Sequence, residues 1–193
     1  MLSVTVGKVT FHFEPLIAYG IIVGVVLLLL IIRAVAWAFR FRKICEAVTG
    51  GRYDDIIRDG ENLLYAYEKQ NARMSNKRLV SQIEYLNFAL AISYFACDND
   101  KLFLKHVNAL TTSLDAKNSW LSLFYLKKND FDTAATYYDE LSYNENIFTM
   151  KTFLDGFRAY QDNDHDAAKK KMAEINDQLT HPVLKNMANE ILQ

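Results

Sequence analysis

The hydrophobic positions of the chain follow two different patterns. From Leu16 to Ile32 every residue is apolar or small, in the run LIAYGIIVGVVLLLLII, and after Arg33 a shorter apolar stretch continues to Phe39. The rest of the sequence mixes polar and apolar residues, and its apolar positions recur every three or four residues. That spacing is typical of amphipathic helices. The pattern therefore predicts an all-α protein with one long apolar helix near its N-terminus.

The apolar segment 16–39 is long enough to cross a lipid bilayer. A helix rising about 1.5 Å per residue would cover roughly 36 Å over this segment, and a hydrocarbon core is about 30 Å thick. Its end carries side chains that suit the membrane interface. These are Arg33, Trp37, Arg40, Arg42 and Lys43. We expect a single-pass transmembrane helix at 16–39, preceded by a short extracytoplasmic tail at 1–15.

The distribution of cations predicts the orientation of this helix. Lys8 is the one cation before the apolar run, whereas four cations follow between residues 33 and 43. Because cytoplasmic flanks of membrane helices are enriched in Lys and Arg, we expect the N-terminus outside and the C-terminal domain in the cytoplasm, at the cell membrane. A cleaved signal peptide is the alternative, with residues 34–36 as the cleavage site. The apolar run is longer than the roughly 7–15 residues of a signal core, which argues against it.

A close-packing motif lies inside the apolar run. Gly20 and Gly24 have the spacing G-x-x-x-G. Two glycines four residues apart leave a flat strip on one helix face, so that a second helix can approach closely. The second helix would belong to another copy of the chain or to another protein. Glycine is also common in transmembrane helices without such a contact.

The charge balance bears on the class of partner. Of the 22 Lys/Arg and 23 Asp/Glu in the chain, five cations and one anion lie in residues 1–45, which leaves 17 and 22 for the rest and a net charge of −5. An acidic domain of this kind argues against nucleic acid as a partner. About 150 residues are enough for one domain with a hydrophobic core.

An internal repeat organises the chain after the membrane segment. The stretch KNDFDTAATYYDEL (128–141) aligns without gaps with DNDHDAAKKKMAEI (162–175), and Asn129-Asp130 thereby matches Asn163-Asp164. The offset of 34 residues is the period of the tetratricopeptide repeat family, which residues 50–178 resemble. The resemblance implies stacked antiparallel helical pairs, in which the Asn-Asp turn caps the second helix. Gly60, Ser122 and Asp155 depart from the family pattern.

Further elements follow from this alignment. A weaker copy has its turn at Asn99-Asp100, where the offset to the next turn is 30 residues and the register is uncertain by one residue. Residues 50–64 have the pattern of a second helix whose first helix would be the inner end of the membrane helix, through a juxtamembrane extension at 40–49. Residues 179–193 begin a helix at Pro182 and are expected to form a capping helix.

The resemblance also implies a binding site. In this family the first helices line a concave groove that holds a peptide or helix of a partner protein. The apolar and aromatic residues at these positions are Tyr85, Phe88, Ile92, Phe95, Leu123, Leu126, Met150, Phe153, Phe157 and Tyr160. The alternative is that the same side chains form ordinary core between helices.

Catalytic and cofactor motifs are missing from the sequence. The four histidines are scattered, no nucleotide-binding or nucleophile motif occurs, and capping accounts for the acidic cluster at 162–166. We therefore expect a membrane-anchored adaptor or scaffold without enzymatic activity, cofactor or metal. One alternative is an accessory subunit assembled mainly through Gly20 and Gly24. Another is an enzyme whose titratable groups converge only in the fold.

Overall fold

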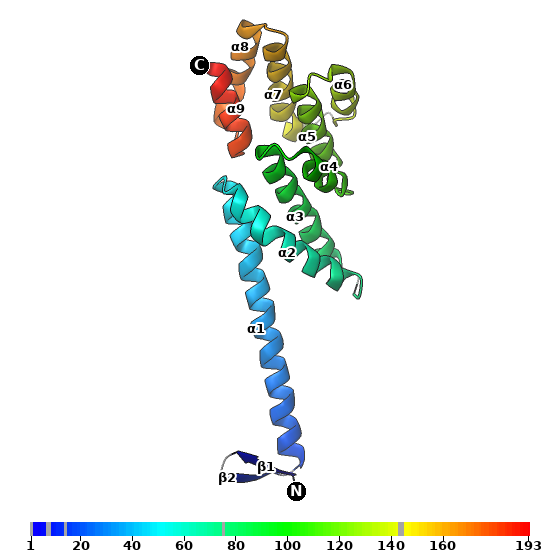
Figure 1. Ribbon diagram of the computed structural model, residues 1–193, viewed down its shortest axis with the longest axis vertical. Coiled ribbons are helices and arrows are strands. Elements are labelled where there is room, and N and C mark those ends of the chain that lie inside the picture. The colour runs from blue at the N-terminus through cyan, green and yellow to red at the C-terminus, as the bar shows by residue number, and fades with distance from the viewer. Residues whose placement is uncertain (1, 7–8, 14, 75, 143–144) are drawn as a thin grey trace. The chain divides into compact units, whose positions relative to one another are not determined.

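The computed structural model describes residues 2–6, 9–13, 15–74, 76–142 and 145–193. Over these residues the chain forms nine α-helices, one short 3-10 helix and one two-stranded hairpin (Figure 1). It divides into two compact units, Met1–Lys43 and Ile44–Gln193. The predicted all-α class is confirmed for the domain that follows the apolar helix.

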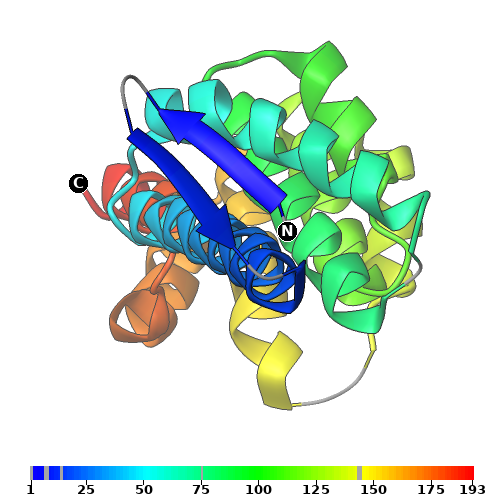
Figure 2. The same ribbon diagram turned by 90° about the horizontal axis from the view of Figure 1, so that it is seen from below.

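The first unit begins with a hairpin that the sequence analysis did not predict. Strand β1 (Leu2–Val6) pairs antiparallel with β2 (Val9–Phe13), with Leu2 opposite Phe13 (Figure 2). The alternating valines, threonines and phenylalanines of both strands favour this conformation. Lys8 and Glu14 lie outside the described residues.

Helix α1 (Pro15–Thr49) follows the hairpin. Within Tyr19–Thr49 the most apolar window of 18 residues has a mean hydropathy of 2.8, and none of that window is buried. Length and composition thus make α1 able to cross a membrane, and it is the one such helix among the described residues. The helix also continues unbroken through the expected extension at 40–49. Its last residues belong to the second unit, where Ile44 and Ala47 are buried.

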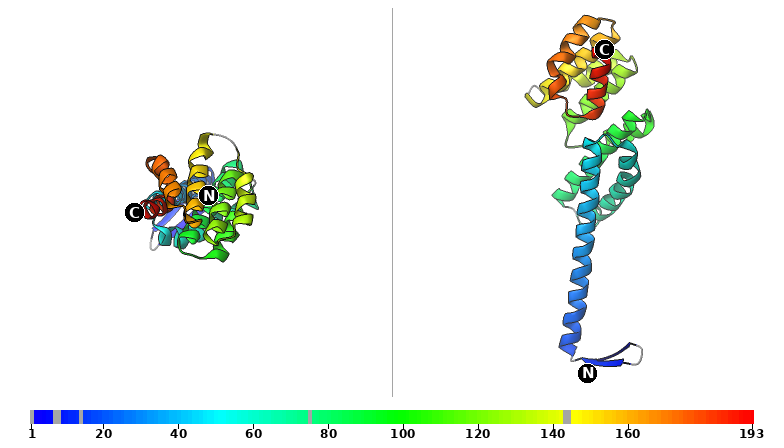
Figure 3. Two further views of the ribbon diagram at one scale, coloured as in Figure 1. Left: turned by 90° about the horizontal axis from the view of Figure 1, so that it is seen from above. Right: turned by 90° about the vertical axis from the view of Figure 1, so that its left-hand side faces the viewer.

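The second unit is a succession of antiparallel helices joined by short turns (Figure 3). Helix α3 packs against α2 and α4, α5 packs against α6 and α7, and α8 packs against α7 and α9. The elements are α2 (Tyr53–Asn71), α3 (Lys77–Ala96), α4 (Asp100–Asn108), α5 (Leu114–Lys127), α6 (Phe131–Asp139), α7 (Glu145–Gln161), α8 (His165–Ile175), the 3-10 helix η1 (Asn176–Gln178) and α9 (Pro182–Leu192).

One turn geometry recurs at four places in this unit. The residue that reverses the chain has a left-handed backbone, at Gly51 (φ +63°), Asp98 (φ +53°), Asn129 (φ +59°) and Asn163 (φ +63°). The N–H of the following residue donates to the carbonyl five positions earlier, as from Asp130 to Tyr125 at 2.9 Å. These bonds satisfy the last carbonyls of one helix. The reversal therefore fixes how each second helix leaves the first.

The residue after the reversal usually caps the next helix. The side chains of Asn99, Asp130 and Asp164 each accept a hydrogen bond from the backbone N–H three residues later. This confirms the capping role of the aligned Asn-Asp pairs. It also resolves the register of the weaker copy: Asp98 and Asn99 correspond to Asn129 and Asp130, so the expected turn Asn99-Asp100 lay one residue too late.

A side-chain bond closes the opposite end of two of the pairs, α3/α4 and α5/α6. Glu84 accepts hydrogen bonds from the N–H (2.7 Å) and hydroxyl (2.6 Å) of Thr111, and Asp115 accepts them from the N–H (2.9 Å) and hydroxyl (2.5 Å) of Ser142. Both acids stand 27 residues before their partners. Burial raises the pKa of Glu84, but the hydrogen bonds outweigh it and lower that pKa below its usual value.

Three departures from the expected repeat pattern have packing explanations. At Gly60 an added Cβ would lie 3.2 Å from Cδ2 of Leu90, so the leucine occupies the space that a larger residue would fill. The Ser122 hydroxyl donates to the carbonyl of Ala134 at 3.0 Å, and this bond satisfies a buried polar group. Asp155 is half-buried and pairs with Lys171 at 3.1 Å.

The repeated turn predicts different effects for two substitutions of Asn129. Asn129→Ala should lower the free energy of unfolding by about 1 kcal/mol, because alanine disfavours the left-handed backbone. Asn129→Gly should leave it unchanged or raise it, since glycine adopts this conformation without a steric cost. Urea unfolding of the full chain in detergent, followed by circular dichroism, measures both. Equal losses for the two variants would contradict the strain argument.

Candidate partner-binding surface

Most residues of the predicted groove belong to the core. Six of the ten are almost inaccessible to solvent: Ile92, Phe95, Leu123, Leu126, Phe153 and Phe157, each with 6% or less of its surface exposed. This corrects the expectation that they line an open groove. Helices α3, α5 and α7 each pack against at least two neighbouring helices, and these side chains lie in the contacts between them. For these six residues the core alternative applies.

The other four predicted groove residues keep some accessible surface. Tyr85, Phe88 and Met150 are half-buried, and Tyr160 is 40% exposed. The Tyr160 ring meets the ring of His165 edge-on, with 5.5 Å between centroids. The Tyr85 side chain is hydrogen-bonded to Cys45, and burial raises the pKa of the tyrosine. For these four residues the groove stays a prediction.

Trp120 on α5 is the centre of the aromatic cluster on the first helices. Its ring makes edge contacts with Phe88 (6.4 Å between centroids), Phe95 (5.3 Å) and His181 (5.5 Å). The sequence analysis missed Trp120, because the equivalent repeat positions hold Ala89 and Leu154 and show no aromatic pattern. The tryptophan therefore connects the first helices to the C-terminal segment.

The C-terminal segment lies against this cluster in an extended conformation. Between η1 and α9 the backbone is extended at Leu179 and His181, and the side chains of Leu179 and Val183 are buried. At the other side of the segment, Cβ of Pro182 lies 3.3 Å from where a Cβ on Gly51 would stand. A short extended peptide of the chain itself thus covers part of the surface around Trp120.

His181 carries an unsatisfied polar atom in this segment. Its Nδ1 accepts a hydrogen bond from the N–H of Val183 at 3.3 Å and so caps α9. Its Nε2 is buried and has no hydrogen-bond partner. Burial lowers the pKa of His181 to about 4. The segment consequently docks with a neutral imidazole and at the cost of one unpaired polar atom.

A second buried histidine lies in a polar network between α2, α3 and α4. His106 is 1% exposed; its Nδ1 is 2.9 Å from Oδ1 of Asn87 and its Nε2 is 2.9 Å from Oε1 of Glu61. The Tyr94 hydroxyl donates to the same Glu61 oxygen at 3.1 Å. Burial lowers the pKa of His106, and Glu61 opposes this effect. Because the ring is enclosed and hydrogen-bonded at both nitrogens, the network fastens three helices together and offers no reactive group to a substrate.

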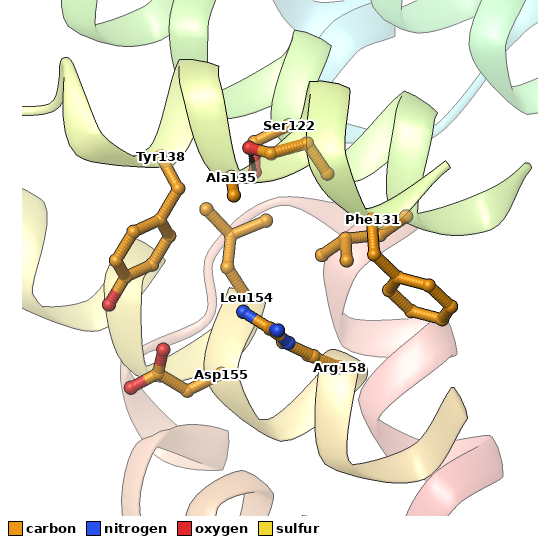
Figure 4. Close-up of a pocket in the computed structure, with 9 residues that line it drawn as sticks. Ser122, Phe131, Ala135, Tyr138, Leu154, Asp155 and Arg158 are labelled. Atoms are coloured by element: carbon orange, nitrogen blue, oxygen red, sulfur yellow. Dashed lines mark hydrogen bonds between the residues drawn. The ribbon is translucent and has the colours of Figure 1, made fainter. Parts of the chain in front are cut away.

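A small cavity lies between α5, α6 and α7 (Figure 4). Its volume is about 40 Å³, and its lining includes Ser122, Tyr138, Asp155 and Arg158. This volume suits a few water molecules and is far below that of an ordinary ligand pocket. The described residues contain no group of three His, Cys, Asp or Glu side chains that could hold a metal ion.

The predicted membrane residues lie along α1. Apart from the adjoining residues and the nearby backbone of α1 itself, no atom of the described structure lies within 4 Å of a Cβ built on Gly20 or Gly24, so this strip is open. The Arg33 guanidinium lies over the Trp37 ring at 5.4 Å from the centroid, and the Lys43 ammonium lies over the Phe39 ring at 5.3 Å. Arg40 and Arg42 are exposed. Cation–aromatic pairs of this kind suit the headgroup layer.

Comparison of the chain with family models, with curated proteins and with solved structures gave no match. Any assignment of function therefore starts from the residues themselves.

The burial of His181 predicts a pH dependence. Its pKa of about 4 in the folded protein lies below the ordinary 6.5, so the unfolded chain binds more protons between these values. Stability from this residue is fully present above pH 6.5 and falls by roughly 1.4 kcal/mol per pH unit as the pH drops toward 4. His181→Asn keeps a capping acceptor but does not titrate. Urea unfolding at several pH values should show a shallower acid loss for His181→Asn than for wild type; parallel curves would contradict this account.

Proposed function

We propose that the chain is a single-pass membrane-anchored adaptor, with its N-terminus outside and a tetratricopeptide-like domain in the cytoplasm that binds a segment of a partner protein. The apolar helix α1 supports the anchor, and the cations between residues 33 and 43 support the orientation. The recurring helical pairs with one shared turn geometry support the repeat family. Anchoring raises the local concentration of a bound partner at the membrane.

The observation that carries the binding function is the docked C-terminal segment. The stretch Leu179–Val183 of this chain, with an extended backbone at Leu179 and His181, already meets the Trp120 ring through His181, and the side chains of Leu179 and Val183 are buried. A surface that accepts this peptide is suited to accept a similar extended, apolar segment of another protein. Half-buried Phe88 lies beside Trp120 and would be part of that contact.

Displacement of the docked segment gives the test of this function. His181→Asp places a carboxylate against Trp120 and should detach the segment, because an unpaired buried charge is costly. A photo-crosslinking residue at Phe88 in the full chain, irradiated in native membranes, should then give a discrete partner band several-fold stronger than with His181 intact. The same probe at Lys170, an exposed position on α8, is the control. A band of equal strength in both backgrounds, or one obtained only at Lys170, would exclude this binding surface.

The open strip on α1 favours a second candidate function, that of an accessory subunit held in a larger membrane complex by its transmembrane helix. Gly20 and Gly24 leave room for another helix along this strip. The double substitution Gly20→Ile/Gly24→Ile should fill it and abolish co-migration with other membrane proteins on native gels. Ile21→Leu/Ile22→Leu adds no bulk and serves as the matched control. Unchanged co-migration of the Gly20→Ile/Gly24→Ile variant would leave the adaptor function as the better supported one.

A further inference from the structure

The tip of the hairpin formed by α2 and α3 carries a concentrated patch of cations and apolar side chains. We name this patch the basic tip; its residues are Tyr65, Lys69, Arg73, Met74, Lys77 and Arg78, and all six are exposed. Tyr65 and Met74 are among the most exposed large apolar side chains of the second unit, at 67% and 65%. Between residues 65 and 81 the one acidic residue is Glu68. The basic tip therefore stands out in a domain whose net charge is −5.

The position of two of these cations is electrostatically unfavourable for the fold. Lys77 and Arg78 occupy the first turn of α3, where the helix dipole favours anions and disfavours cations. The described helices α2, α4, α5, α6 and α8 all have an aspartate in the first turn, and α3 has no acidic residue there. None of the four cations forms an ion pair with another described residue. Fold stability therefore does not explain the charge of the basic tip.

We propose that the basic tip docks on the surface of an anionic lipid bilayer, that of the membrane which α1 anchors. The inference rests on the proposed membrane anchoring. Lys and Arg side chains near an anionic membrane surface each contribute about a fivefold preference for the bound state. Tyrosine suits the interfacial layer, and the flexible Met74 side chain enters its apolar part. A mixture of exposed cations and apolar groups at the end of a hairpin matches this layer better than either type of residue alone.

Chain length places the basic tip within reach of the membrane surface. If Arg40 marks the headgroup level, the nine residues to the end of α1 at Thr49 extend about 14 Å beyond it. Helix α2 has 19 residues and spans roughly 28 Å. A helix of that length is sufficient to return to the surface. The anchor also holds the tip at a high effective concentration near the lipid, so modest affinity is enough for docking.

A depth-sensitive probe at residue 74 tests the proposal. The full chain with Met74→Cys, in a Cys45→Ser/Cys97→Ser background, is labelled with an environment-sensitive fluorophore and placed in nanodiscs. We expect a blue shift and quenching by brominated lipid in discs containing phosphatidylserine. Discs of neutral phosphatidylcholine should give neither, and high salt should remove both. Lys77→Gln/Arg78→Gln should lower the ratio of docked to free tip by on the order of 25-fold.

Two controls keep this experiment decisive. Removing Lys77 and Arg78 relieves an unfavourable dipole interaction, so loss of docking would not reflect unfolding. Lys169→Gln/Lys170→Gln makes the same charge change on exposed positions of α8 and should leave the signal unchanged. The proposal is overturned if quenching is equal in neutral and anionic discs, if Lys77→Gln/Arg78→Gln has no effect, or if the tip instead crosslinks to another protein without lipid quenching.

Extraction with alkaline carbonate distinguishes a failure of the docking proposal from a failure of the proposed membrane anchoring. If alkaline carbonate extracts the chain from membranes, the anchoring fails, and the docking proposal fails with it. If the chain stays integral and the probe at residue 74 reports water in every disc, only the docking proposal fails.

Discussion

The second unit depends on one constraint, the left-handed residue that reverses the chain between paired helices. Gly51, Asp98, Asn129 and Asn163 each adopt this backbone, and the hydrogen bond from the next N–H closes the preceding helix. A reversal of fixed geometry decides which face of the second helix meets the first. Without it, the apolar positions that recur along the sequence would not come into register, and neighbouring pairs could not stack to bury their apolar faces.

Packing of the first helices follows from this reversal. Once each pair is set, α3 and α5 lie between neighbours and many of their side chains become core, and the Trp120 ring meets His181 of the C-terminal segment. Hydrogen-bonded polar side chains join the helices at two kinds of position, the ends of the pairs and the interior between helices. Glu84 and Asp115 close the ends of their pairs, and Glu61, His106 and Asn87 fasten α2, α3 and α4. His181 Nε2, at the edge of the docked segment, is one of the buried polar atoms without a hydrogen-bond partner, and Oε2 of Glu84 is another.

The sequence predicted what depends on local spacing and missed what depends on distant contacts. The turns at Asn129 and Asn163 could be predicted because both copies contain the same Asn-Asp pair. In the weaker copy the turn begins at Asp98, one residue before the Asn99-Asp100 pair that the alignment used. Periodicity showed that the faces of α3 and α7 are apolar, but it does not show what covers them, and Phe153 and Phe157 proved to be core. The contact between Trp120 and His181 joins residues 61 positions apart, and no repeat signal connects them. The N-terminal hairpin was missed because two five-residue strands give only a weak pattern.

Charge is distributed unevenly over the domain, and the stability of the fold does not require this asymmetry. Aspartates begin five of its helices, where they stabilise the helix dipole, whereas cations begin α3. An acidic surface is repelled by anionic lipid, and a basic tip is attracted to it. The two effects act in the same direction, because each favours an arrangement in which the tip faces lipid and the acidic surface faces solvent. Charge placement would in this way reinforce the proposed docking of the basic tip on the membrane.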